Sequence, residues 1–127
     1  MKNNKRGFTL IEIVMVLVLL GILSAVAVPK YYDLKDKAEQ QTALAVIAEY
    51  QARLNGSFAE NLLGGKSCKD ALDQAKTDLT GFKDEGHGYE VTLAATSTSG
   101  LVPATITRNS QAITGTFKVS IPKCSGS

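Results

Sequence analysis

The chain has 127 residues, which suits one domain, and 44% of them are hydrophobic. Its formal net charge of +2 identifies no partner, because Lys2, Lys5 and Arg6 all precede Phe8. Without those three residues, 11 basic residues stand against 12 acidic ones, so composition does not indicate a nucleic-acid-binding surface. The early basic residues instead favour an amino end held on the cytoplasmic side of a membrane.

A long apolar segment follows the basic stretch. Residues 8–28 form a run of 21 that contains one acid, Glu12. At about 1.5 Å per residue a helix of this length spans about 30 Å, the thickness of a bilayer's hydrocarbon core. Three interpretations follow. The segment is an ordinary signal peptide cut after Ala25-Val26-Ala27, a plain single-span anchor, or the retained part of a precursor that is cut between Gly7 and Phe8.

The single acid favours the third interpretation. An ionisable group in a membrane helix costs roughly 2.5–3.5 kcal/mol, and neither a signal peptide nor a plain anchor needs one. Cleavage after Gly7 would create a new α-amine at Phe8. Opposite charges about 4 Å apart attract by roughly 4 kcal/mol at an effective dielectric constant of about 20. The amine of a neighbouring copy would therefore offset the burial of Glu12 and fix the stagger between helices.

The motif Gly7-Phe8-Thr9-Leu10-Ile11-Glu12 resembles the cleavage and methylation motif of type IV prepilins and of type II secretion pseudopilins. The resemblance implies that a dedicated membrane peptidase cuts after Gly7 and N-methylates Phe8, and that Glu12 is the assembly glutamate. Gly21 and Pro29 fall where such pilins have a glycine and a proline, which bracket a stretch that can loosen in the assembled filament.

Beyond the apolar segment the sequence predicts two helices. Pro29 is expected to kink or locally break the first, because proline lacks an N–H and clashes with the preceding turn. Residues 33–54 are rich in good helix formers, with Leu44, Ile47, Leu54 and Phe58 near one face and polar Gln51 interrupting that face. Asn55-Gly56 is a stop signal, so one long helix is expected from Phe8 to about Asn55. A short helix is expected over about residues 69–79, with Ser67 as its N-cap.

Alternation of apolar and polar residues then predicts strands. It is clear in residues 89–93, 104–107 and 117–121, with a turn at Asn109-Ser110 and a flexible loop over 96–100. The expected fold class is α+β, in which a long amino-terminal helix packs on a small antiparallel sheet of three or four strands. The expected divisions are a leader at residues 1–7, the helix at 8–55 with its membrane or assembly segment at 8–28, and a globular domain at 56–127.

The two cysteines, Cys68 and Cys124, are 56 positions apart and do not have the spacing of a metal site. They are either free thiols or a disulfide, and a disulfide is favoured if the body lies outside the cytoplasm. Closing such a loop would add on the order of 4 kcal/mol in the chain-entropy model. The pairing resembles the carboxy-terminal disulfide of many pilins, although there both cysteines usually lie nearer the end.

These features predict a structural subunit of a type IV pilus-like filament, not an enzyme, with no cofactor and no metal. The alternatives are a pseudopilin of a type II secretion system, or a minor pilin with a binding role. The expected partners are further copies in a helical filament, a prepilin peptidase, the inner membrane before assembly, and an assembly machinery with a separate ATPase. The ATPase is separate because the sequence has no glycine-rich phosphate-binding motif. The expected final location is a filament on the cell surface.

Overall fold

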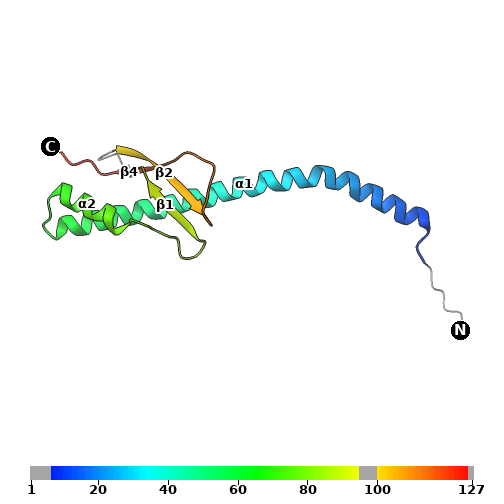
Figure 1. The fold of residues 1–127 in the computed structure, drawn as a ribbon, viewed down its shortest axis with the longest axis horizontal. Helices are drawn as coiled ribbons and strands as arrows, with labels where there is room; N and C mark the ends of the chain where they lie inside the picture. Colours follow the sequence, from blue (N-terminus) through cyan, green and yellow to red (C-terminus); the bar gives the residue numbers. More distant parts are fainter. Residues whose placement is uncertain (1–6, 95–99, 126–127) are drawn as a thin grey trace, which may run out of the picture. The chain divides into compact units, whose positions relative to one another are not determined.

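The computed structural model describes residues 7–94 and 100–125, and the chain divides into two compact units, Met1–Lys37 and Ala38–Ser127. The basic residues Lys2, Lys5 and Arg6 and most of the expected 96–100 loop lie outside the described residues. The elements, labelled in Figure 1, are helices α1 (Leu10–Leu63) and α2 (Cys68–Asp78) and strands β1 (Tyr89–Leu93), β2 (Gly100–Arg108), β3 (Gln111–Ala112) and β4 (Phe117–Ile121). The long apolar helix and the antiparallel sheet confirm the expected α+β class.

Within the first unit, α1 continues through Pro29, so the expected local break does not occur. Proline's fixed φ is close to the helical value, and its insertion removes only one backbone hydrogen bond from a helix that continues on both sides. All side chains from Gly7 to Lys37 are exposed. This unit is therefore a helix with no core of its own.

The prediction that α1 ends near Asn55 is wrong, because the helix runs on to Leu63. Gly65 adopts φ +83°, its N–H donates to the Leu62 carbonyl at 3.0 Å, and the Lys66 N–H donates to the Asn61 carbonyl at 3.2 Å. This hydrogen-bond pattern is a Schellman motif, which ends a helix at a left-handed glycine. Gly64-Gly65, rather than Asn55-Gly56, is therefore the stop signal.

Tertiary contacts explain why Gly56 does not end the helix. Glycine inside a helix costs about 1 kcal/mol relative to alanine. In the next turn Phe58 packs against the core, and the Ser57 hydroxyl donates to the Asp78 carboxylate of α2 at 2.7 Å. Hydrogen bonds from Gln74 and then Ser57 hold the pKa of Asp78 below its usual value. These contacts join the end of α1 to the end of α2 and favour continuation of the helix.

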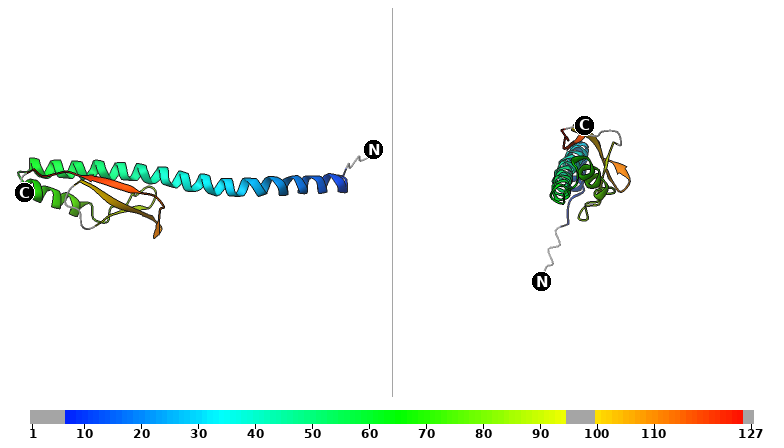
Figure 2. Two further views of the ribbon diagram at one scale, coloured as in Figure 1. Left: turned by 90° about the horizontal axis from the view of Figure 1, so that it is seen from above. Right: turned by 90° about the vertical axis from the view of Figure 1, so that its left-hand side faces the viewer.

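The short helix forms as expected. The Ser67 hydroxyl accepts a hydrogen bond from the Asp70 N–H at 3.2 Å, which makes Ser67 the N-cap of α2. Helix α2 buries Ala71, Leu72 and Ala75 and leaves its polar side exposed. Figures 1 and 2 show α2 and the sheet lying along the carboxyl-terminal part of α1.

Strands β1, β3 and β4 each pair antiparallel with β2. Strand β1 pairs along one side of β2, with Val91 opposite Ile106, while β3 and β4 pair with successive parts of its other side. The expected turn at Asn109-Ser110 is present, and both residues have positive φ, as a two-residue type I′ hairpin requires. Pro103 is tolerated within β2 because it lies next to Ala94, just beyond the end of β1.

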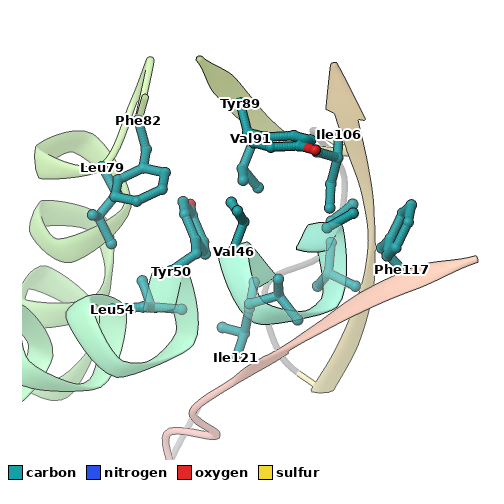
Figure 3. Close-up of a cluster of buried hydrophobic side chains, with 14 of the residues drawn as sticks. Val46, Tyr50, Leu54, Leu79, Phe82, Tyr89, Val91, Ile106, Phe117 and Ile121 are labelled. Carbon is teal, nitrogen blue, oxygen red and sulfur yellow. The ribbon is translucent and has the colours of Figure 1, made fainter. Parts of the chain in front are cut away.

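The core of the second unit lies between α1 and one face of the sheet, where Figure 3 shows the side chains converging. The strands bury the apolar residues of the predicted alternation, apart from Leu93, which is only partly buried, and they also bury Val102: Tyr89, Val91, Val102, Ala104, Ile106, Phe117, Val119 and Ile121. The helix contributes Ala43, Val46, Tyr50 and Leu54. The predicted helix face was therefore partly wrong: Leu54 is buried and Ile47 and Phe58 are partly buried, but Leu44 is 49% exposed. Burial of Tyr50 raises the pKa of its hydroxyl.

Gly115 lies next to the ring of Phe117, which is part of the core. A Cβ placed on Gly115 would lie 2.8 Å from Phe117 Cζ, and that ring is buried. We expect Gly115→Ala to displace the ring and to lower the free energy of unfolding by about 1–3 kcal/mol, as overpacking of a core does. Urea unfolding of the full chain in detergent measures this. Gly86→Ala is the matched control, because its Cβ would meet only Asp84 Oδ1 at 3.6 Å, and a loss of stability as large in the control would contradict the explanation.

Candidate functional site

The first turn of α1 is closed by a reciprocal pair of hydrogen bonds. The Thr9 N–H donates to Glu12 Oε2 at 2.9 Å, and Thr9 Oγ1 accepts from the Glu12 N–H at 3.4 Å. This arrangement is a capping box, in which residues three positions apart satisfy each other's backbone donors at a helix start. This role of Thr9 was not predicted. The spacing Thr-x-x-Glu directly before an apolar helix was the signal that could have revealed it.

The capping box changes the electrostatics of Glu12. The carboxylate lies in the first turn, where the helix dipole favours negative charge, and it accepts a backbone hydrogen bond from its own chain. Part of the cost of placing an acid in an apolar helix is therefore offset within the chain itself. A carboxylate has about four acceptor positions. One bond from Thr9 thus leaves Glu12 able to accept a further donor, such as an amine.

The surroundings of Glu12 are apolar. The side chains that surround it are Phe8, Ile11, Ile13, Met15, Val16 and Leu17, all of them exposed. The large side chains along the rest of the segment are also exposed, from 48% at Val14 to 82% at Leu10. A contiguous exposed apolar surface of this extent indicates a membrane or protein contact. By length and composition alone, α1 contains a stretch able to cross a membrane.

Two further predicted positions, Gly21 and Pro29, lie inside α1 in the first unit. A Cβ added at Gly21 would meet no atom within 4 Å, so local packing does not require the glycine. Between the two, the Ser24 hydroxyl donates to the Leu20 carbonyl at 2.7 Å. Such bonds from serine to the preceding turn weaken and often bend helices. Ser24 thus adds a third feature to the stretch for which loosening was expected.

The predicted disulfide is confirmed. Cys68 and Cys124 are bonded, and their Cα atoms lie 5.7 Å apart. The bond joins the first residue of α2 to the segment that follows β4. It therefore encloses α2 and the whole sheet in one covalent loop.

The lone histidine forms a local contact. Nδ1 of His87 lies 2.9 Å from Asp84 Oδ2, while Oδ1 of the same carboxylate accepts the Gly86 N–H at 3.2 Å. These two bonds, that of His87 first, hold the pKa of Asp84 below its usual value. The His87 side chain is 66% exposed. Within residues 7–94 and 100–125, no three potential metal ligands gather at one place.

Comparison with known proteins gives a family match at the amino end. The model of the prokaryotic N-terminal methylation motif matches residues 2–28. That range contains Gly7 to Glu12 and the whole apolar segment of residues 8–28.

The sequence similarity to three relatives extends beyond this motif. A fimbrial protein of Dichelobacter nodosus is 34% identical over 86 residues, which cover 68% of this chain and 51% of that protein. The type II secretion system core protein G of Dickeya chrysanthemi is 40% identical over 55 residues, 43% of this chain and 36% of that protein. The type IV narrow pilus major component PilA5 of Thermus thermophilus is 51% identical over 49 residues, 35% of this chain and 42% of that protein. The chain thus spans about half the length of these relatives, or less. No solved structure matches significantly.

Proposed function

We propose that this chain, which belongs through its amino-terminal segment to the type IV pilin and pseudopilin family, is the precursor of a structural subunit of a type IV pilus-like filament. The observation that carries the proposal is the exposed apolar helix that begins with the Thr9–Glu12 capping box. An apolar surface of this extent is typical of a helix that contacts lipid or another protein. A filament supplies the second environment after a membrane has supplied the first.

The proposed maturation begins with cleavage after Gly7. A membrane peptidase removes residues 1–7 and N-methylates the new amine at Phe8. The mature subunit waits in the inner membrane with residues 8–28 in lipid. An assembly machinery with its own ATPase then moves it into a filament on the cell surface, where Gly21 and Pro29 allow the helix to loosen.

The proposed role of Glu12 is to register neighbouring subunits. Its carboxylate keeps the hydrogen bond from its own Thr9 and also accepts the Phe8 amine of another copy. The apolar surface supplies most of the contact area but allows sliding, because dispersion and burial have little directionality. One charge pair in that surface favours a single stagger.

A second candidate is a subunit of the short filament of a type II secretion system. The relation to the core protein G of Dickeya chrysanthemi supports it, since that protein matches at 40% identity. The two functions share the amino-terminal site and differ in what the carboxyl-terminal unit contacts. A minor pilin with a binding role is the third possibility, and the near balance of charge in the body does not favour it.

Intact-mass measurement of the mature protein tests the proposal. The chain is expressed together with a prepilin peptidase, extracted from membranes and reduced before analysis. The expected product begins at Phe8 and carries one methyl group. A product that begins near Val26 or Val28 would instead identify ordinary secretion, and an uncut chain would identify a plain anchor. Gly7→Ala is a control at which cleavage should remain, whereas a bulky residue at position 7 should prevent it.

A further inference from the structure

The outer edge of β4 is where the sheet of the second unit is open to another strand. Strand β4 pairs with β2 along one side, and among the described residues no strand pairs with its other side. In an antiparallel pair, alternate residues direct their N–H and C=O groups away from the partner strand. In β4 these residues are Lys118 and Ser120, as the contacts of Ser120 demonstrate.

The side chain of Gln51 occupies the backbone groups of Ser120. Gln51 Nε2 donates to the Ser120 carbonyl at 2.8 Å, and Gln51 Oε1 accepts the Ser120 N–H at 2.7 Å. The amide of Gln51 presents an N–H donor and a C=O acceptor side by side, as a residue of a neighbouring strand does, and its Nε2 also donates to Asn55 Oδ1 at 3.1 Å. Gln51 is half-buried and follows Tyr50, which is buried in the core, so its reach toward β4 is fixed by packing. This explains the polar residue that interrupts the apolar face of the helix.

We propose that Gln51 locks this edge and thereby prevents β4 from pairing with β4 of a second copy. Unpaired strand edges are sites of unwanted association, and proteins commonly protect them with charges, prolines or covering groups. Here Lys118 places a charge on the edge strand, and Pro122 follows the strand without an N–H to donate.

The opposite edge of the sheet is protected by a different device. The segment before β1 covers part of that strand through an isolated bridge between Lys83 and Glu90. The Asp84 N–H donates to the Tyr89 carbonyl at 2.8 Å, and the Val91 N–H donates to the Phe82 carbonyl at 3.2 Å. Covering therefore occurs at the outer sides of β1 and β4, by backbone at β1 and by a side chain at β4.

A second copy is the partner that fits the edge of β4 once it is unlocked. An antiparallel pair of β4 strands with Val119 opposite Val119 places Phe117 opposite Ile121 and Lys118 opposite Ser120. The apolar residues then share one face, and no like charges oppose each other. Such a pair is self-complementary about a two-fold axis. If the proposed function holds, the lock also leaves the apolar helix as the route by which subunits associate.

Replacement of Gln51 by alanine tests the lock in the full chain, held in detergent so that no filament is needed. A photo-reactive residue at position 118 reports contacts between copies, and mixed light and heavy isotope labelling separates crosslinks between copies from those within one. We expect Gln51→Ala to produce crosslinks to residues 117–122 of the second copy, several-fold above the wild type. Exchange of the Ser120 amide hydrogen should become about tenfold faster, which corresponds to about 1.4 kcal/mol. Gln51→Asn, whose shorter amide does not reach the strand, should behave in the same way if the alanine variant folds poorly.

Two controls separate edge protection from loss of stability. Ile106→Val destabilises the same unit through its core and should not raise these crosslinks. Adding Ser120→Pro to Gln51→Ala removes the freed N–H at a position that does not bond to β2, and it should abolish the crosslinks without restoring stability. The proposal is overturned if Gln51→Ala crosslinks no more than Ile106→Val, or if the added proline changes nothing. None of these readouts depends on cleavage after Gly7 or on filament formation, so they leave the proposed function to its own test.

Discussion

Cells that produce the Glu12→Ala variant should insert the protein in the membrane normally and assemble almost no filaments. In the proposed filament the substitution removes two stabilising interactions, one between subunits and one within the helix. The attraction between the carboxylate and a neighbouring amine is roughly 4 kcal/mol at an effective dielectric constant of about 20. The capping box with Thr9 adds about 1 kcal/mol, the usual cost of removing a helix cap. Electron microscopy of sheared filaments measures the outcome, and membrane fractionation with intact mass verifies insertion and cleavage.

Two matched variants separate these contributions. Glu12→Gln retains an oxygen that can accept the Thr9 N–H but loses the charge, so filaments should be nearly as rare as with alanine. Thr9→Ala removes the hydroxyl of the capping box but keeps the backbone donor and the carboxylate, so assembly should be reduced only slightly. Normal filament numbers from Glu12→Ala would contradict the registering role of Glu12, and a Thr9→Ala defect as severe as that of Glu12→Ala would place the effect in helix capping instead.

Local patterns predicted most of the second unit. Apolar and polar residues alternate in β1 and β4, and successive side chains of a strand point to opposite faces of the sheet. The order of residue types therefore indicates which side chains face the core. Ser67 begins α2 because its hydroxyl meets a backbone donor three residues along, which is a local interaction. The bond between Cys68 and Cys124 was predictable because the two cysteines of a chain have one possible pairing with each other in an oxidising environment.

What could not be predicted depended on contacts between distant residues. Gly56 has a local cost that any helix would incur, and the helix continues because of distant contacts: Phe58 packs against the core, and Ser57 bonds to Asp78, 21 positions away. Leu44 and Tyr50 are both plausible inward residues, but Tyr50 is the buried one, and its ring meets that of Phe82, in the segment between α2 and β1, at 5.4 Å between centroids. Gln51 bonds to a residue 69 positions away. The role of Thr9 is different, because its signal was local and was overlooked.

Removal of the disulfide should have the largest effect on the stability of the second unit. The double variant Cys68→Ser, Cys124→Ser opens a loop with a sequence separation of 56 residues. In the chain-entropy model a loop of this length contributes on the order of 4 kcal/mol. Small domains have a total stability of about 5–15 kcal/mol. We therefore expect a unit that is marginally stable or unfolded at 37 °C, measured by urea unfolding of the full chain in detergent.

The position of the disulfide determines which part loosens first. Since the bond joins the start of α2 to the segment after β4, its loss should free Cys124 and the residues near it before the centre of the sheet opens. Hydrogen exchange should therefore rise first at residues 66–72 and 121–125 and last at Val102 and Ile106, which are fully buried. Reductant added to the wild type should reproduce this order and should not alter the double variant further. If the wild type and the double variant were equally stable, the core alone would maintain the fold. A uniform rise in hydrogen exchange would mean that the unit opens in one step.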